Sequence, residues 1–167
     1  MNLLNLSDSL EQMDFSGLSE AEIIYGLLFA VSNRIQACAD KVLPDITSRQ
    51  HFLLIVLSVF KDKYPSLKEV AKAMGSSYQN VKKMADSLEK KEFIVVKRDE
   101  YDKRKYNLMM TDKVSELSKV IDENADIFMR NLYKGLTKED LRHTITVLTQ
   151  MEMNLNENTK QRGLKKR

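Results

Sequence analysis

A short run of hydrogen-bonding and cationic side chains is the part of this sequence best suited to binding a partner. Gln79 and Asn80 carry side-chain amides, and Lys82 and Lys83 follow them closely. Such amides can form bidentate contacts with base edges, and lysines can contact phosphates or guanine. The run therefore predicts contact with duplex DNA, although a lysine pair is also compatible with a plain solvated helix face.

The run lies near the start of a predicted helix from Ser77 to Lys90. Apolar residues recur along this helix at three- and four-residue steps, at Val81, Met84, Ala85 and Leu88. The polar residues therefore share the opposite face, near a helix N-terminus whose partial positive charge favours phosphate. A shorter helix, Leu67 to Met74, precedes it, and Gly75 permits the tight turn between the two.

The pattern changes after this helix from helical to extended. Phe93–Val96 is apolar and β-branched, Asp99–Arg104 is a charged turn, and Tyr106–Met110 returns as a second strand. Two helices, a tight turn and a hairpin in this order predict a winged helix-turn-helix over about residues 47–110.

Long amphipathic helices flank this unit on both sides. Ser19 and Glu22 have capping-box spacing ahead of an apolar stripe that ends before Pro44. After the hairpin, Thr111 is expected to cap a further helix, Gly135 to end it, and Thr137 with Asp140 to begin the last. The predicted fold is mainly α with a small β-hairpin wing, preceded by an arm over residues 1–18.

The remaining composition argues against several other classes. The 167 residues carry a net charge of +3 and a single cysteine. No apolar run is long enough to span a membrane, and no signal peptide is evident, so a cytoplasmic protein is expected. No catalytic, metal or cofactor motif is present, so no enzyme activity and no cofactor are expected.

Cys38 needs separate weighing because cysteine can sense oxidants. It falls on the apolar stripe of the first long helix, between Ile35 and Val42. Reactive thiols need an exposed, electropositive setting, so a buried structural role is the favoured interpretation. A redox-sensing regulator that uses Cys38 is kept as an alternative.

Two segments together resemble the MarR (multiple-antibiotic-resistance regulator) family. Gly75–Glu89 followed by Phe93–Val95 is similar to that family's recognition helix and first wing strand. Arg98–Arg104, with Leu108 and Thr111 after it, is similar to its wing. The resemblance extends over nearly the whole chain after Ser19, which makes residues 19–167 one MarR-like domain.

The resemblance implies a homodimer whose helices at about residues 19–43 and 111–158 interleave. It implies that each recognition helix enters a major groove and each wing tip an adjacent minor groove. Arg104 matches the wing-tip arginine, and Asp102 the carboxylate that holds the wing in shape. Together with the helix residues, the predicted DNA-binding set is Ser77, Tyr78, Gln79, Asn80, Lys82, Lys83, Asp102, Lys103 and Arg104.

Two positions depart from the family pattern. Tyr101 stands where the wing usually has arginine, so one wing contact is either missing or replaced by stacking. Glu92 stands where the family usually has glycine after the recognition helix. If residue 92 is left-handed, glutamate there costs on the order of 1 kcal/mol.

The sequence thus predicts a sequence-specific transcription regulator, with a repressor favoured over an activator. Its expected partners are double-stranded DNA with a near-palindromic operator and a second copy of the chain, and the resemblance allows a small-molecule effector. The competing interpretation is a winged helix that docks protein. Exposed apolar anchors would favour docking, whereas this helix offers Gln, Asn and Lys.

Overall fold

The computed structural model describes residues 15–43, 45–60 and 64–164, with the backbone alone at 116–124 and 158–164. The elements are α2 (Glu20–Val42), α3 (Ser48–Val59), α4 (Leu67–Ala73), α5 (Tyr78–Lys90), β1 (Ile94–Arg98), β2 (Tyr106–Met110), α6 (Lys113–Leu132) and α7 (Lys138–Leu164).

The predicted fold class, mainly helical with one hairpin, is confirmed. Most of the predicted arm, residues 1–14, lies outside the described residues. The chain divides into two compact units, Met1–Asp126 and Ile127–Arg167.

Side chains at the helix starts set most of the boundaries. In a capping box, the first side chain accepts from the third helical N–H, and the third side chain accepts in return. The reciprocal pairs are Ser19 with Glu22 for α2, Thr47 with Gln50 for α3, Ser66 with Glu69 for α4, and Thr137 with Asp140 for α7. These local contacts explain why the sequence located the helix starts well.

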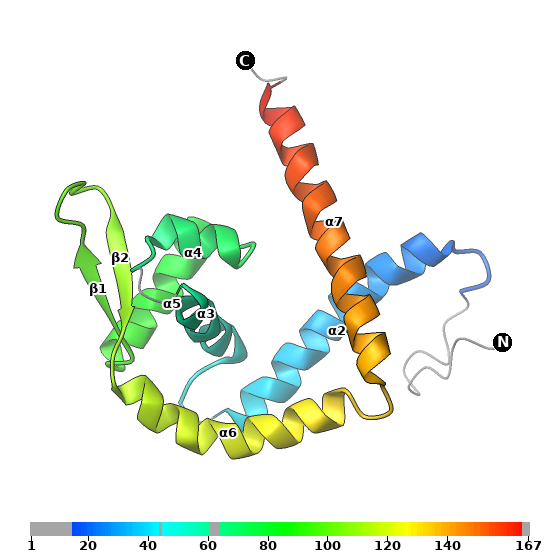
Figure 1. Ribbon diagram of the computed structural model, residues 1–167, viewed down its shortest axis with the longest axis horizontal. Helices are drawn as coiled ribbons and strands as arrows, with labels where there is room; N and C mark the ends of the chain where they lie inside the picture. The colour runs from blue at the N-terminus through cyan, green and yellow to red at the C-terminus, as the bar shows by residue number, and fades with distance from the viewer. Residues whose placement is uncertain (1–14, 44, 61–63, 165–167) are drawn as a thin grey trace. The chain divides into compact units, whose positions relative to one another are not determined.

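The winged helix has an apolar core made by α3, α4, α5 and the hairpin, which lie together in Figure 1. Its most deeply buried large side chains are Leu53, Val70, Val81, Leu88, Ile94 and Leu108. They come from α3, α4, α5 and both strands of the hairpin, so each element is held by several others. Burial of this kind supplies most of the stability of a small domain.

The hairpin is antiparallel, with Val96 opposite Leu108 and Arg98 opposite Tyr106. The linker before α4 joins it, because the Leu108 N–H donates to the Pro65 carbonyl at 2.9 Å and Ser66 forms a bridge with Asn107. This third segment attaches the wing directly to the start of the helix-turn-helix.

Two details differ from the sequence prediction. The first strand runs from Ile94 to Arg98, so it begins later and ends later than the predicted Phe93–Val96. The helix after the hairpin begins at Lys113, and the Thr111 hydroxyl donates back to the carbonyls of Glu92 and Phe93 instead of capping it. Thr111 therefore ties the end of the hairpin to its beginning.

The helix α2 differs from the winged helix because most of its apolar side chains are exposed. Ala39 is the only residue of α2 that is buried. Cys38 is exposed, contrary to the expected structural burial, because an apolar stripe does not reveal whether the chain itself covers it. None of the helices in the described part of the chain combines the length and the hydropathy that a membrane span requires.

Candidate nucleic-acid interface

The turn between α4 and α5 places the start of α5 at the surface. Gly75 has a φ of +58°, which glycine adopts at little cost. The Ser76 N–H donates to the Ala71 carbonyl at 2.9 Å, which closes the end of α4. Ser77 then caps α5 by accepting the Asn80 N–H at 3.2 Å. Of the predicted site, Ser77 thus has a demonstrated structural role at the helix N-terminus.

The two faces of α5 are sharply divided. Val81, Ala85 and Leu88 are buried, at steps of four and three residues. All six predicted helix positions, Ser77, Tyr78, Gln79, Asn80, Lys82 and Lys83, are exposed. The polar face is therefore open to a partner, and the apolar face fixes the direction in which it points.

Hydrogen bonds from neighbouring elements also hold α5 in place. Gln50 of α3 is only 7% exposed, and its amide donates to the Ser87 hydroxyl of α5 at 2.9 Å. Near the end of α5, the Glu89 carboxylate accepts the Val96 N–H of β1 at 2.8 Å. These contacts anchor the helix from behind and leave its exposed face unoccupied. Sequence reasoning missed the contact between Gln50 and Ser87, which are far apart in the chain.

Two carboxylates order the wing turn, and Asp99 accepts more donors than Asp102. One Asp99 carboxylate oxygen accepts the N–H groups of Tyr101 at 3.0 Å and Asp102 at 2.8 Å, and the other accepts the Asn107 amide at 2.9 Å. The Asp102 N–H, then the Asn107 amide, hold the pKa of Asp99 below its usual value of 3.8. An aspartate that accepts N–H groups two and three residues ahead is a recognised turn signal, so the sequence offered this clue.

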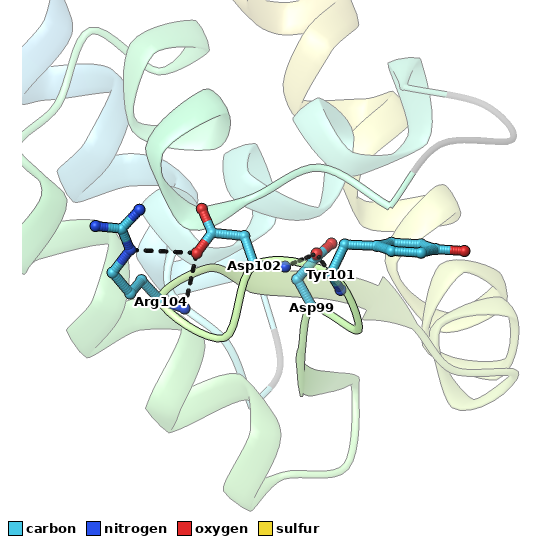
Figure 2. A network of polar contacts seen from close by, with 4 residues as sticks. All are labelled: Asp99, Tyr101, Asp102 and Arg104. Atoms are coloured by element: carbon cyan, nitrogen blue, oxygen red, sulfur yellow. Dashed lines mark hydrogen bonds and ion pairs between the residues drawn. The ribbon is translucent and has the colours of Figure 1, made fainter.

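Asp102 has a narrower task, shown in Figure 2. Its carboxylate accepts the Arg104 backbone N–H at 3.1 Å and pairs with the Arg104 Nε at 3.3 Å. The Arg104 side chain is 93% exposed. Asp102 therefore restrains the arginine at its inner nitrogen and leaves the guanidinium tip free to reach outward. Lys103, beside them, is also exposed.

The charges of this region are arranged so that its acids are mostly occupied within the chain. Asp99 and Glu89 accept backbone N–H groups, Asp102 pairs with Arg104, and Glu92 pairs with Lys113 at 3.1 Å. Within the described part of the chain, no ion pair engages Lys82, Lys83 or Lys103. These three lysines are thus available to an anionic partner.

Comparison with known proteins finds a family that the region resembles. Residues 45–105 match the model of the MarR family. This region is similar to the winged helix of the MarR family. No curated protein matches the chain in sequence.

Solved structures extend the likeness to most of the chain. A MarR protein from Peptoclostridium difficile is 20% identical with a TM-score of 0.72, covering 87% of this chain and 94% of its own. The S. aureus MepR–DNA complex is 26% identical with a TM-score of 0.68, covering 78% and 97%. Bordetella bronchiseptica BpsR, whose DNA binding is regulated by 6-hydroxynicotinic acid, is 21% identical with a TM-score of 0.66, covering 77% and 98%.

Proposed function

We propose that this chain regulates transcription by binding duplex DNA as a homodimer, through the MarR-family recognition helix and wing. The observation that carries the proposal is the exposed polar and cationic face of α5, anchored from behind by Val81, Ala85 and Leu88. A helix fits the major groove of B-DNA, where base edges offer distinct patterns of donors and acceptors. The likeness to the MepR–DNA complex supports the same partner.

Each exposed residue has a role that follows from its chemistry. Gln79 and Asn80, in the first turn of α5, read base edges, and Lys82 and Lys83 contact phosphates or guanine. Tyr78, half-exposed, packs on a sugar next to the helix start. Ser77 keeps the helix N-terminus ordered, which adds a favourable partial charge for phosphate.

The wing adds a second contact beside the helix. Arg104 inserts into the minor groove, where a narrow groove concentrates negative potential. Asp102 limits the arginine's freedom in advance, so less conformational entropy is lost on binding. Lys103 contacts the flanking backbone.

The second copy is proposed because α2 and α7 expose large apolar side chains that a partner would cover. On α2 these are Ile24, Tyr25, Leu28, Phe29 and Val31, and on α7 they include Ile145, Leu148, Met153 and Leu155. Exposed apolar area of this extent typically marks an interface. A two-fold dimer presents two recognition helices to two half-sites, which implies a near-palindromic operator and favours repression by occlusion.

A protein-docking role is less well supported. Docking faces use clusters of buried anchors such as Trp, Tyr and Leu, whereas Tyr78 is the single large apolar side chain exposed on α5. Control by oxidation would have to proceed through Cys38 alone, because the chain has no second cysteine for an internal disulfide.

The experiment is a gel shift with the DNA upstream of the chain's own gene, repeated at several salt concentrations. Affinity is expected to fall steeply with salt as cations release counterions.

Arg104→Ala is expected to weaken binding to all sequences, and Gln79→Ala or Asn80→Ala to change base preference as well. Arg142→Ala on α7 removes the same charge outside the winged helix and serves as the control. Unaltered preference in both amide variants would contradict the assigned base readout.

A further inference from the structure

We propose that the wing reads DNA through two chemically different contacts, one cationic from Arg104 and one neutral from the ring of Tyr101. The tyrosine ring packs against deoxyribose in the wall of the minor groove. This inference rests on the proposed function, because it names a further contact in the same DNA interface. It assigns Tyr101 a contact whose contribution to affinity does not depend on salt.

The first observation is that Tyr101 is displayed on a turn that is already ordered. Tyr101 is 97% exposed, the largest fraction among the large apolar residues described. Its backbone N–H is held by Asp99, which also holds Asp102 and Asn107. A tyrosine on a fixed backbone has only two side-chain torsions to restrict, so packing it costs little entropy.

The second observation is the direction of the side chains. In Figure 2 the Tyr101 ring leaves the turn on the side away from Arg104, whose Nε stays with Asp102. The two groups therefore reach different parts of a groove and do not compete for one position. Their contributions to binding should accordingly be independent.

The third step is chemical. An arginine at a wing tip displaces counterions and makes binding more sensitive to salt. A neutral ring gains affinity by removing apolar area from water, which salt hardly screens. A tyrosine at position 101, where the wing usually has arginine, therefore keeps a contact. It also makes affinity depend less on salt than an arginine there would.

The test uses the full chain and a duplex that it binds, with affinity measured by fluorescence anisotropy from about 50 to 200 mM salt. Tyr101→Ala is expected to weaken binding by on the order of tenfold at every salt concentration, with the slope of log affinity against log salt unchanged. Arg104→Ala is expected to reduce the magnitude of that slope by about 0.9 for each wing, and Tyr101→Arg to increase it by the same amount.

Two further variants define the contact. Tyr101→Phe is expected to bind within about twofold of wild type, because the ring and not the hydroxyl makes the contact. The double variant of Tyr101→Ala and Arg104→Ala is expected to lose the product of the two single losses. Loss in Tyr101→Phe equal to that in Tyr101→Ala would overturn packing by the ring.

The inference and the proposed function fail in different ways. If wild type shows no salt-dependent binding to any duplex, the proposed function itself is wrong. If wild type binds and Arg104→Ala weakens it while Tyr101→Ala binds normally, only the tyrosine contact is overturned. Because Tyr101 is fully exposed, its variants should melt at the wild-type temperature, so lost binding would not reflect unfolding.

Discussion

The winged helix and the helix α2 treat apolar residues in opposite ways. In the winged helix, Leu53, Leu88 and Leu108 are almost completely buried by the chain's own elements. On α2, Tyr25 and Phe29 stack edge to face at 5.1 Å, yet both rings remain exposed. Large apolar residues usually occur where other residues cover them. The difference therefore indicates that one chain covers the apolar residues of the winged helix but not those of α2.

The exposed surfaces of the two regions also differ in chemistry. The exposed face of α5 is polar and suits nucleic acid, whereas α2 and α7 each expose several large apolar side chains that suit a second copy. The buried residues of α5 fix the direction of its polar face, and α2 and α7 each begin with a capping box. The predictions below test whether the two regions really differ in this way.

The largest effect is expected in the core of the winged helix. Leu88→Ala should lower the free energy of unfolding by about 2–5 kcal/mol, because Leu88 is fully buried and a cavity remains. Urea unfolding measures the change. Leu136→Ala, at an exposed position between α6 and α7, is the matched control and should cost less. An equal cost at the two positions would mean that burial of Leu88 in this core does not stabilise the fold.

The second-largest effect is expected on the proposed dimer contact of α2. Phe29→Glu should dissociate the dimer, because the interface would bury a charge with no opposite charge beside it. Operator affinity should then fall by on the order of 100-fold, since two linked half-site contacts become separate. Sedimentation velocity and anisotropy report the two changes.

Tyr64→Glu provides the control for that experiment. Tyr64 is exposed to the same 60% as Phe29 but lies in the linker before α4. It should leave the dimer intact. A dimer that survives Phe29→Glu would remove this part of α2 from the interface.

A smaller effect is expected at the wing turn. Asp99→Ala removes the acceptor of the Tyr101, Asp102 and Asn107 donors, and should weaken DNA binding by about tenfold without changing the dimer. Asp99→Asn should retain part of the affinity, because its amide oxygen can still accept both backbone N–H groups. Equal losses in the two variants would mean that the negative charge, not hydrogen bonding, orders the turn.

The lowered pKa of Asp99 also has a pH consequence. A carboxyl whose folded pKa lies below 3.8 stabilises the turn at every pH above that value, and the stabilisation is lost as the pH falls through the folded pKa. The turn should therefore stay ordered from neutral pH down to about 4. NMR titration of the carboxyl carbon gives the value directly, and a pKa at or above 3.8 would contradict the structure.

The smallest effect is expected at Glu92, which has a φ of +64°. Glu92→Gly should raise the melting temperature, with a gain on the order of 1 kcal/mol, and leave DNA binding unchanged. The exposed pair with Lys113 offsets little of this gain. Lys90→Gly, two residues earlier and still helical, should be destabilising. A lower melting temperature for Glu92→Gly would show that the ion pair outweighs the backbone strain.

The sequence predicted those features that depend on neighbouring residues. Capping boxes, the left-handed Gly75 and the division of α5 into two faces all follow from spacing along the chain. The left-handed conformation of Glu92, expected conditionally, is also present. What sequence could not supply were contacts between distant segments, such as Gln50 with Ser87 or Pro65 with Leu108.

The errors have a common physical origin. The predicted burial of Cys38 was wrong. An amphipathic stripe shows which residues prefer burial but not which molecule covers them. Asp102 does contact Arg104, but the contribution of Asp99 to the same turn was missed, because only the donors around each carboxylate distinguish the two. At both positions the deciding information is three-dimensional.

The most direct test is selection of bound duplexes from a random-sequence pool by the purified full-length protein. The account predicts an enriched motif with two inverted half-sites whose centres lie about 10–10.5 base pairs, or a multiple of that, apart. Gln79→Ala and Asn80→Ala should alter the bases within each half-site while keeping the spacing. A pool that yields no enriched sequence, or one motif shared by wild type and both variants, would contradict recognition by the exposed face of α5.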